Sequence, residues 1–223
     1  MSTIDTQHLI EQLAGEAAPV GRLPSPWVRT AFWLAVAAVN LVVFVLAMSP
    51  RRDLGAAFAD PAFIVEQLAA LATGITAGLA AFGSVVPGFD RRLLLLPLLP
   101  LAVWLASVGT GCVTSWIRLG PAGLTVTPDW ACVPAIALIG LAPAVIIAFM
   151  LRRGAPLTPR TTAALGGLAA AGLGSFALRL CHAEDASVMV LIWQVGTVAL
   201  LTAAAGAAGR WLLGSRILTR CGR

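Results

Sequence analysis

Long apolar runs alternate with short polar segments along almost the whole chain. Each run is long enough for a helix that crosses a bilayer, which takes roughly 20 residues. There are six runs, at residues 27–48, 63–86, 93–113, 131–151, 161–180 and 187–213. The pattern predicts an all-α polytopic membrane protein, a bundle of six transmembrane helices within residues 27–213.

The segment before the first run, residues 1–26, has a different pattern. Apolar residues recur there at helical spacing, which predicts a short amphipathic helix that Pro19 ends. The apolar stripe consists of Leu9, Ile10, Leu13 and Ala17. A helix this short is marginal alone in water, so the stripe either docks on a protein partner or lies on the inner leaflet. At the other end of the chain, residues 214–223 are expected to form a short basic tail.

Composition supports the membrane interpretation. Hydrophobic residues make up 59% of the chain and charged residues 11%, with a mean hydropathy of +0.90, far from the balance of soluble domains. The net charge of +5 would suggest nucleic acid in a soluble protein. Here the arginines lie at the ends of apolar runs, where membrane topology explains them, so we expect no direct contact with nucleic acid.

The arginines also orient the bundle, because short cytoplasmic loops retain positive charge. With the N-terminus inside, the arginines on the inner side are Arg22, Arg29, Arg91, Arg92, Arg152, Arg153, Arg160, Arg210, Arg216, Arg220 and Arg223. Those on the outer side are Arg51, Arg52, Arg118 and Arg179. This asymmetry predicts that both termini are cytoplasmic.

Small and polar residues within the runs predict helix contacts. Asn40 and Gln194 are expected to hold helices together by hydrogen bonds. Close packing of the fifth and sixth helices is expected from Gly166, Gly167, Gly172, Gly174, Gly206 and Gly209. Kinks in the third and fourth helices are expected from Pro97, Pro100, Pro134 and Pro143.

The sequence offers little for catalysis or ion-coupled transport. Its two histidines, His8 and His182, fall on opposite sides of the predicted bilayer, and no Ser-His-Asp set is plausible, so we expect no enzyme. Ionisable residues are almost absent from the centres of the runs, because Glu66 and Arg179 lie toward helix ends. A small metal or metabolite transporter with an outer Cys-His gate is the alternative function, and the missing midplane charges count against it.

Cysteines gather at the predicted outer face. Cys112 is expected to end the third helix, Cys132 to begin the fourth and Cys181 to end the fifth, whereas Cys221 falls inside. Two outer thiols could form a disulfide, or a reduced pair could bind a soft metal ion with His182 beside it. Each cysteine could also be a small apolar filler, an alternative that the polar neighbours of Cys132 and Cys181 make weaker for those two. No constitutive cofactor is expected.

Five segments resemble the NrsF family. They are residues 17–24 (AAPVGRLP), 129–134 (DWACVP), 150–157 (MLRRGAPL), and 178–182 (LRLCH) followed by 189–193 (MVLIW). The members are six-span anti-sigma factors of the bacterial inner membrane, which hold an extracytoplasmic-function sigma factor inactive. The resemblance extends over nearly the whole chain.

The resemblance implies roles for two regions. The N-terminal segment, with the stripe above and the leader residues Val20, Arg22 and Leu23, would bind the sigma factor. Cys132 and Cys181 would correspond to a pair of outward-facing cysteines linked to sensing of heavy metals or related stress. On this basis the chain is predicted to sequester a sigma factor and to release it under heavy-metal or oxidative stress.

Overall fold

The architecture comes from a computed structural model, which describes residues 6–16, 23–124, 132–154, 156–181 and 187–213. These residues contain helices and no strand. Their order is α1 (Thr6–Glu16), α2 (Pro26–Met48), α3 (Leu54–Ala57), α4 (Pro61–Gly83), η1 (Arg91–Leu95), α5 (Leu98–Leu119), η2 (Gly120–Leu124), α6 (Cys132–Arg152), α7 (Pro159–Cys181), α8 (Ser187–Met189), η3 (Val190–Val195) and α9 (Gly196–Leu213). Six helical segments are long and apolar enough to span a membrane, which confirms the predicted fold.

Local sequence sets the start of two of these helices. Ser25 caps α2 by accepting a hydrogen bond from the amide of Val28, and proline follows at the first helical position. Asp60 caps α4 in the same way, since its Oδ1 lies 2.9 Å from the amide of Ala62. Such caps satisfy amides that have no partner within the helix.

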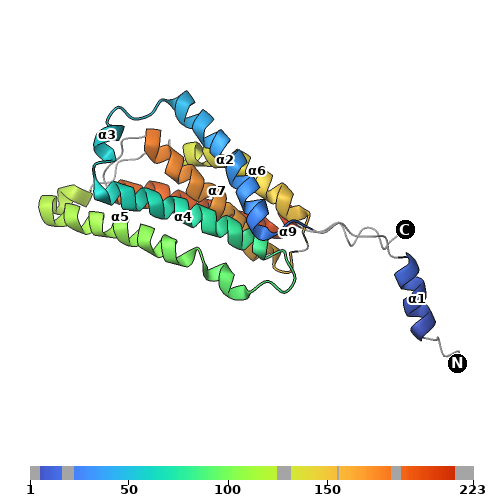
Figure 1. Ribbon diagram of the computed structural model, residues 1–223. Coiled ribbons are helices and arrows are strands. Elements are labelled where there is room, and N and C mark those ends of the chain that lie inside the picture. The colour runs from blue at the N-terminus through green and yellow to red at the C-terminus, as the bar shows by residue number, and fades with distance from the viewer. Residues whose placement is uncertain (1–5, 17–22, 125–131, 155, 182–186, 214–223) are drawn as a thin grey trace.

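Helix α7 lies at the centre of the bundle and packs against α4, α6 and α9 (Figure 1). Its glycines make these contacts close. A Cβ on Gly174 would lie 2.9 Å from the carbonyl oxygen of Ile136 in α6, and one on Gly172 would lie 3.4 Å from Gly74 in α4. Gly209 of α9 also has little room, because a Cβ there would lie 2.6 Å from the carbonyl oxygen of Pro159. The close packing predicted from the glycines is confirmed.

Proline in α6 explains a polar contact with α2. Pro143 has no N–H, so the carbonyl of Ile139, four residues earlier, loses its helical donor. The side-chain amide of Asn40 donates to that oxygen at 3.0 Å, and the indole of Trp33 donates to the oxygen of Pro143 at 2.9 Å. Asn40 therefore links two helices, as predicted, and repairs the hydrogen-bond deficit that the proline creates.

The third span departs from the prediction. Its first residues form the 3-10 helix η1, and α5 starts at Leu98 and continues to Leu119. Cys112 therefore lies inside α5 and does not end it, because the helix continues through a hydroxyl-rich turn that hydropathy alone scores as loop. The expectation of kinks at all four prolines is also wrong: of these, only Pro143 lies in a helix interior. Pro97 precedes α5, and the other two occupy first turns, where a proline costs no internal hydrogen bond.

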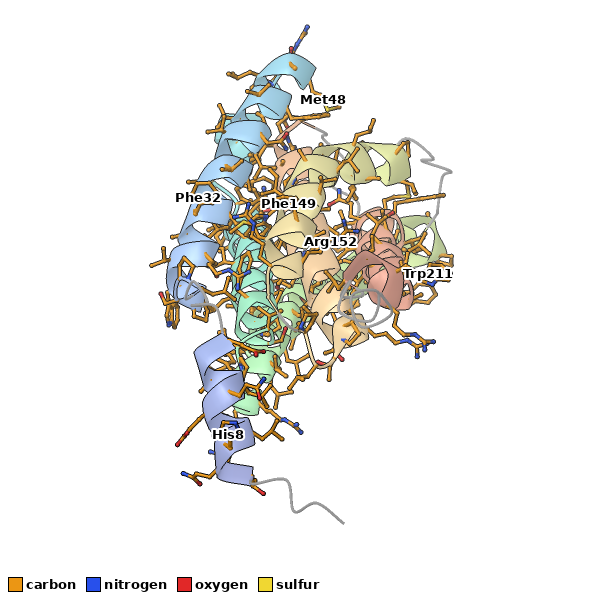
Figure 2. The ribbon with its side chains drawn as sticks, turned by 90° about the vertical axis from the view of Figure 1, so that its right-hand side faces the viewer. His8, Phe32, Met48, Phe149, Arg152 and Trp211 are labelled. Carbon is orange, nitrogen blue, oxygen red and sulfur yellow. The ribbon has the colours of Figure 1, made fainter. Side chains whose placement is uncertain are left out.

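The bundle has two ends, called here the near end, where α2 begins, and the far end, where α2 finishes. Seven described arginines lie at the near end and four at the far end, as the helix order requires. In Figure 2, which views the molecule from the side of the termini, Arg152 of α6 and Trp211 of α9 are labelled, and Met48 marks the far end of α2. Apolar side chains such as Phe32 and Phe149 are exposed on the sides of the bundle, as expected of a surface that faces lipid.

Candidate functional site

A polar cavity of about 880 Å³ opens at the far end, between the start of α4 and the second half of α5. One wall is a stripe of α5 in which polar or small residues recur every three or four positions. The stripe consists of Ser107, Thr110, Gly111, Thr114, Ser115 and Arg118. The opposite wall comes from residues 51–66, and α7 contributes Arg179. A polar space of this size is within the range of small-molecule sites.

A buried ion pair lies at the bottom of this region. Arg179 Nη2 in α7 donates to Glu66 Oε2 in α4 at 3.1 Å, and both side chains are largely shielded from solvent. The Arg179 guanidinium also lies over the ring of Phe63, with its carbon 5.3 Å from the ring centre. A buried charge is tolerated when a counter-charge and further contacts compensate for its lost hydration. The pair therefore fixes α4 against α7 at the far end.

A second guanidinium joins the loop after α2 to the same place. The backbone amide of Arg51 donates to the carbonyl of Leu180 at 3.0 Å, next to the end of α7. The side chain of Arg51 forms two hydrogen bonds with Asp53, at 2.8 and 2.6 Å, and lies over Phe63 from 5.7 Å. These hydrogen bonds lower the pKa of the exposed Asp53 carboxyl to about 2.

The predicted sensor cysteines lie at this end of the bundle. Cys132 is the first residue of α6 and Cys181 is the last residue of α7, and these helices are antiparallel neighbours. The Cys181 thiol is half-buried and lies 4.0 Å from the carbonyl oxygen of Val45 in α2. The side chain of Cys132 and all of His182 are outside the described residues.

Cys112, in α5, lies apart from the helix ends that carry Cys132 and Cys181. Helix α5 packs against α4 and α8, whereas α6 packs against α2, α7 and α9, and both helices contact η3. Figure 1 accordingly shows α5 and α6 on different sides of the central helices. Across the described parts of the chain, no group of three or more Cys, His, Asp or Glu side chains is arranged to hold a metal ion.

The predicted partner-binding residues lie at the opposite end. Helix α1 has no buried residue, and Figure 1 shows it apart from the bundle. Leu9, Ile10 and Leu13 are all exposed, and so is Leu23 beyond α1. The other three candidates, Ala17, Val20 and Arg22, fall in the part of the chain that the structure does not describe, as does the tail with Cys221.

Arginines close the near end of the bundle. Arg29, buried in α2, donates to the carbonyl of Met150 near the end of α6 and lies over the ring of Phe82 from 4.7 Å. Arg152 donates to the carbonyl of Leu212 near the end of α9. Positive side chains at the last carbonyls of a helix are favoured by its dipole, so these contacts stabilise the near end.

A comparison with protein families shows to which family the chain belongs. A family model described as "Negative regulator of sigma F" (NrsF) matches residues 13–214. The chain belongs to the NrsF family. No curated protein and no solved structure matches it. The matched region of this NrsF protein includes all six spans and the end of α1, so the family assignment covers both the far-end cavity and the start of the bundle.

The family gives this protein a class of function. An NrsF protein is a negative regulator of a sigma factor, so its target is a sigma factor and its role is regulatory. The six spans make it a multi-pass membrane protein. Anti-sigma activity and a membrane location, both predicted from the sequence, are confirmed at this level.

Sequence reasoning missed the polar stripe of α5 in this NrsF protein. The stripe includes hydroxyls and a glycine, which count as nearly neutral on a hydropathy scale, so the run seemed to end at Val113. The signal that could have found it is the repeat of polar residues at helical spacing from Ser107 to Arg118, with the apolar Val113 and Ile117 between them.

Proposed function

We propose that this protein is an anti-sigma factor of the bacterial inner membrane which sequesters an extracytoplasmic-function sigma factor through its N-terminal segment. The observation that carries the proposal is α1, whose apolar residues Leu9, Ile10 and Leu13 are exposed although the family assignment requires a soluble protein target. A helix of 11 residues is marginal alone in water and gains stability from a partner that covers its apolar side. Docking of such a helix into an apolar groove is a common recognition mode.

Charge suits this partner as well. Glu11 and Glu16 lie on α1, and Glu16 accepts a hydrogen bond from Gln12, one turn earlier. Sigma factors bind DNA, and surfaces that bind DNA are basic, so an acidic helix is complementary to the surface that it would cover. Occupation of that surface would keep the sigma factor from promoter DNA and from core polymerase.

The orientation follows from the arginines. Seven described arginines at the near end against four at the far end favour the near end as cytoplasmic. Both termini and α1 would then be in the cytoplasm with the sigma factor, and the far end would face outward. Reporter fusions at residue 1 and in the segment 125–131 test this arrangement, since only the first should be active with a cytoplasmic reporter.

The binding helix is tested by two matched variants. Leu9→Ala/Leu13→Ala removes apolar contact and keeps helix propensity, because alanine is the best helix former. Each leucine-to-alanine change is expected to weaken the free energy of binding by about 1–2 kcal/mol. The double variant should therefore bind the sigma factor roughly 30- to 1000-fold more weakly and activate a sigma-dependent reporter. Gln12→Ala, on another face of the same helix, is the control. Full retention of the sigma factor on membranes carrying the double variant would refute this role of α1.

We further propose that Cys132 and Cys181 sense heavy-metal ions or oxidants. Their positions support it, because the last residue of α7 and the first of α6 lie at the same end of two packed helices. A disulfide or a bound soft metal ion, with His182 as a further ligand, would change the relative position of these two helices. The change would be transmitted along both helices to the near end of the bundle.

The sensor is tested separately from the binding helix. Cys132→Ser/Cys181→Ser should abolish induction by cadmium or by a thiol oxidant and leave repression without stress intact. Cys112→Ser, in α5 on the other side of the bundle, is the matched control and should respond as the natural protein does. Unchanged induction in the double variant would contradict the sensor and leave the α1 proposal standing.

A further inference from the structure

The far-end cavity is used neither by α1 nor by the cysteines, and its chemistry is that of a binding site. We propose that it binds a small zwitterion, a molecule that carries an ammonium group together with a carboxylate or phosphate group. The inference concerns the cavity alone and holds whichever side of the membrane the far end faces.

The wall formed by α5 is built for a polar occupant. Four hydroxyl side chains of this helix line the cavity, whereas Val113 and Ile117, on other faces of the same helix, are exposed like lipid-facing residues. Membrane helices usually bring apolar or small residues together at their contacts. Here the two helices leave about 880 Å³ between them and line it with hydroxyls, which favours a hydrophilic ligand.

The charges in the lining favour a ligand that carries both a positive and a negative group over a simple cation or anion. Among the described residues that line the cavity, three carry guanidinium groups and three carry carboxylates, and the pairs Arg51–Asp53 and Arg179–Glu66 are formed within the protein. The remaining two groups are Arg118, near the end of α5, and Asp60, at the start of α4, and both are exposed. Neither makes an ion pair with a described residue. One cation and one anion on opposite walls match a ligand that also carries one of each.

Two of the four hydroxyl groups are oriented to suit the ammonium end. Thr110 donates its proton to the carbonyl of Ser107 at 2.8 Å, and Thr114 donates to the carbonyl of Thr110 at 2.9 Å. Because both protons are used within the helix, the oxygens are acceptors toward the cavity. The Asp60 carboxylate uses Oδ1 for the helix cap, and its second oxygen is a further acceptor. Arg118 supplies the donors for the anionic end of the ligand.

Two sources could supply such a ligand: a free solute related to amino acids, or the headgroup of a zwitterionic lipid such as phosphatidylethanolamine. The test uses the full chain in nanodiscs of phosphatidylglycerol, which offers no ammonium headgroup. The probes are glycine, β-alanine, 4-aminobutyrate and 6-aminohexanoate, which differ in the separation of their charges. Butyrate and butylamine carry only one of the two charges and serve as probe controls.

Binding is measured by saturation-transfer NMR of each probe. At least one zwitterion should bind saturably and roughly tenfold more tightly than butyrate or butylamine, because each charge-assisted contact is worth about one factor of ten. In nanodiscs that contain phosphatidylethanolamine, weaker apparent binding of the probe would identify the headgroup as the source, and unchanged binding would identify a free solute.

Two variants locate the site. Asp60→Asn keeps a good helix cap and removes the charge, and Arg118→Gln removes the opposite charge. Each substitution should weaken the binding of the best probe roughly tenfold. Asp90→Asn and Arg91→Gln are matched controls at the near end, since Asp90 caps η1 through a hydrogen bond of the same 2.9 Å length. Absence of saturable binding for every zwitterion, or binding by both cavity variants equal to that of the natural chain, would overturn the proposal.

Discussion

Removal of one charge from the buried pair between Glu66 and Arg179 should destabilise the bundle strongly. The charged atoms are 3.1 Å apart, which at an effective dielectric constant of about 20 corresponds to an attraction of roughly 5 kcal/mol. Loss of one partner from a buried pair costs about 3–5 kcal/mol in soluble proteins. We therefore expect Glu66→Gln, which keeps the shape of the side chain, to lower the free energy of unfolding by about 3 kcal/mol.

A double-mutant cycle separates the pair from other contacts of the two residues. Unfolding is followed in mixed micelles as the fraction of SDS is raised, for Glu66→Gln, Arg179→Met and the combination. The double variant should be less destabilised than the sum of the single ones by at least about 1 kcal/mol. Arg153→Met, which removes an exposed arginine, is the control and should stay within about 0.5 kcal/mol of the natural chain. A coupling below about 0.5 kcal/mol would refute the assignment of the stability to this pair.

Three further changes have defined outcomes in the same unfolding assay. Asn40→Leu should lower the free energy of unfolding by about 0.5–2 kcal/mol. The loss should be much smaller when Pro143→Ala restores the missing N–H, so equal losses with and without Pro143→Ala would contradict this role of Asn40. Gly209→Ala should cost about 1–3 kcal/mol because its Cβ has no room, whereas Gly109→Ala, with open space around it, should stabilise α5 slightly; the reverse order would contradict the packing. Asp53, whose pKa is lowered to about 2, should contribute fully above about pH 4 and lose its contribution as the pH falls through 2, so an acid titration of Asp53→Asn should lack that step.

Hydropathy and residue size were enough to predict most of the bundle. Apolar length specifies a spanning helix whatever its partners are, because every backbone polar group must be bonded within the segment. Glycines at 167, 174 and 209 identified the tightly packed helices for a similarly local reason, since only a missing side chain allows such contacts. Asn40 was correctly expected to link two helices, but its particular partner depends on Pro143 lying opposite it, which no local pattern reveals.

The far-end cavity was not predictable in the same way. Arg51, Glu66 and Arg179 come from three separate segments, and each seemed to be a charge at a helix end. Their meeting depends on the relative depth of α4 and α7, which is a property of the packed bundle. The length of α5 was misjudged because a stripe of hydroxyls lowers mean hydropathy while it keeps helical periodicity.

The central position of α7 has a consequence for how relatives of this chain can diverge. On three sides the helix has almost no room for side chains, since a Cβ on Gly167 would lie 2.6 Å from the Cβ of Ala205 and one on Gly174 would lie 2.9 Å from the carbonyl oxygen of Ile136. Side-chain volume is therefore constrained there more than chemical character, and serine or alanine should replace glycine before leucine does. On the exposed sides of α2 and α5, volume is free and hydropathy is constrained. An alignment of relatives should show these two kinds of restriction on different helices of one bundle.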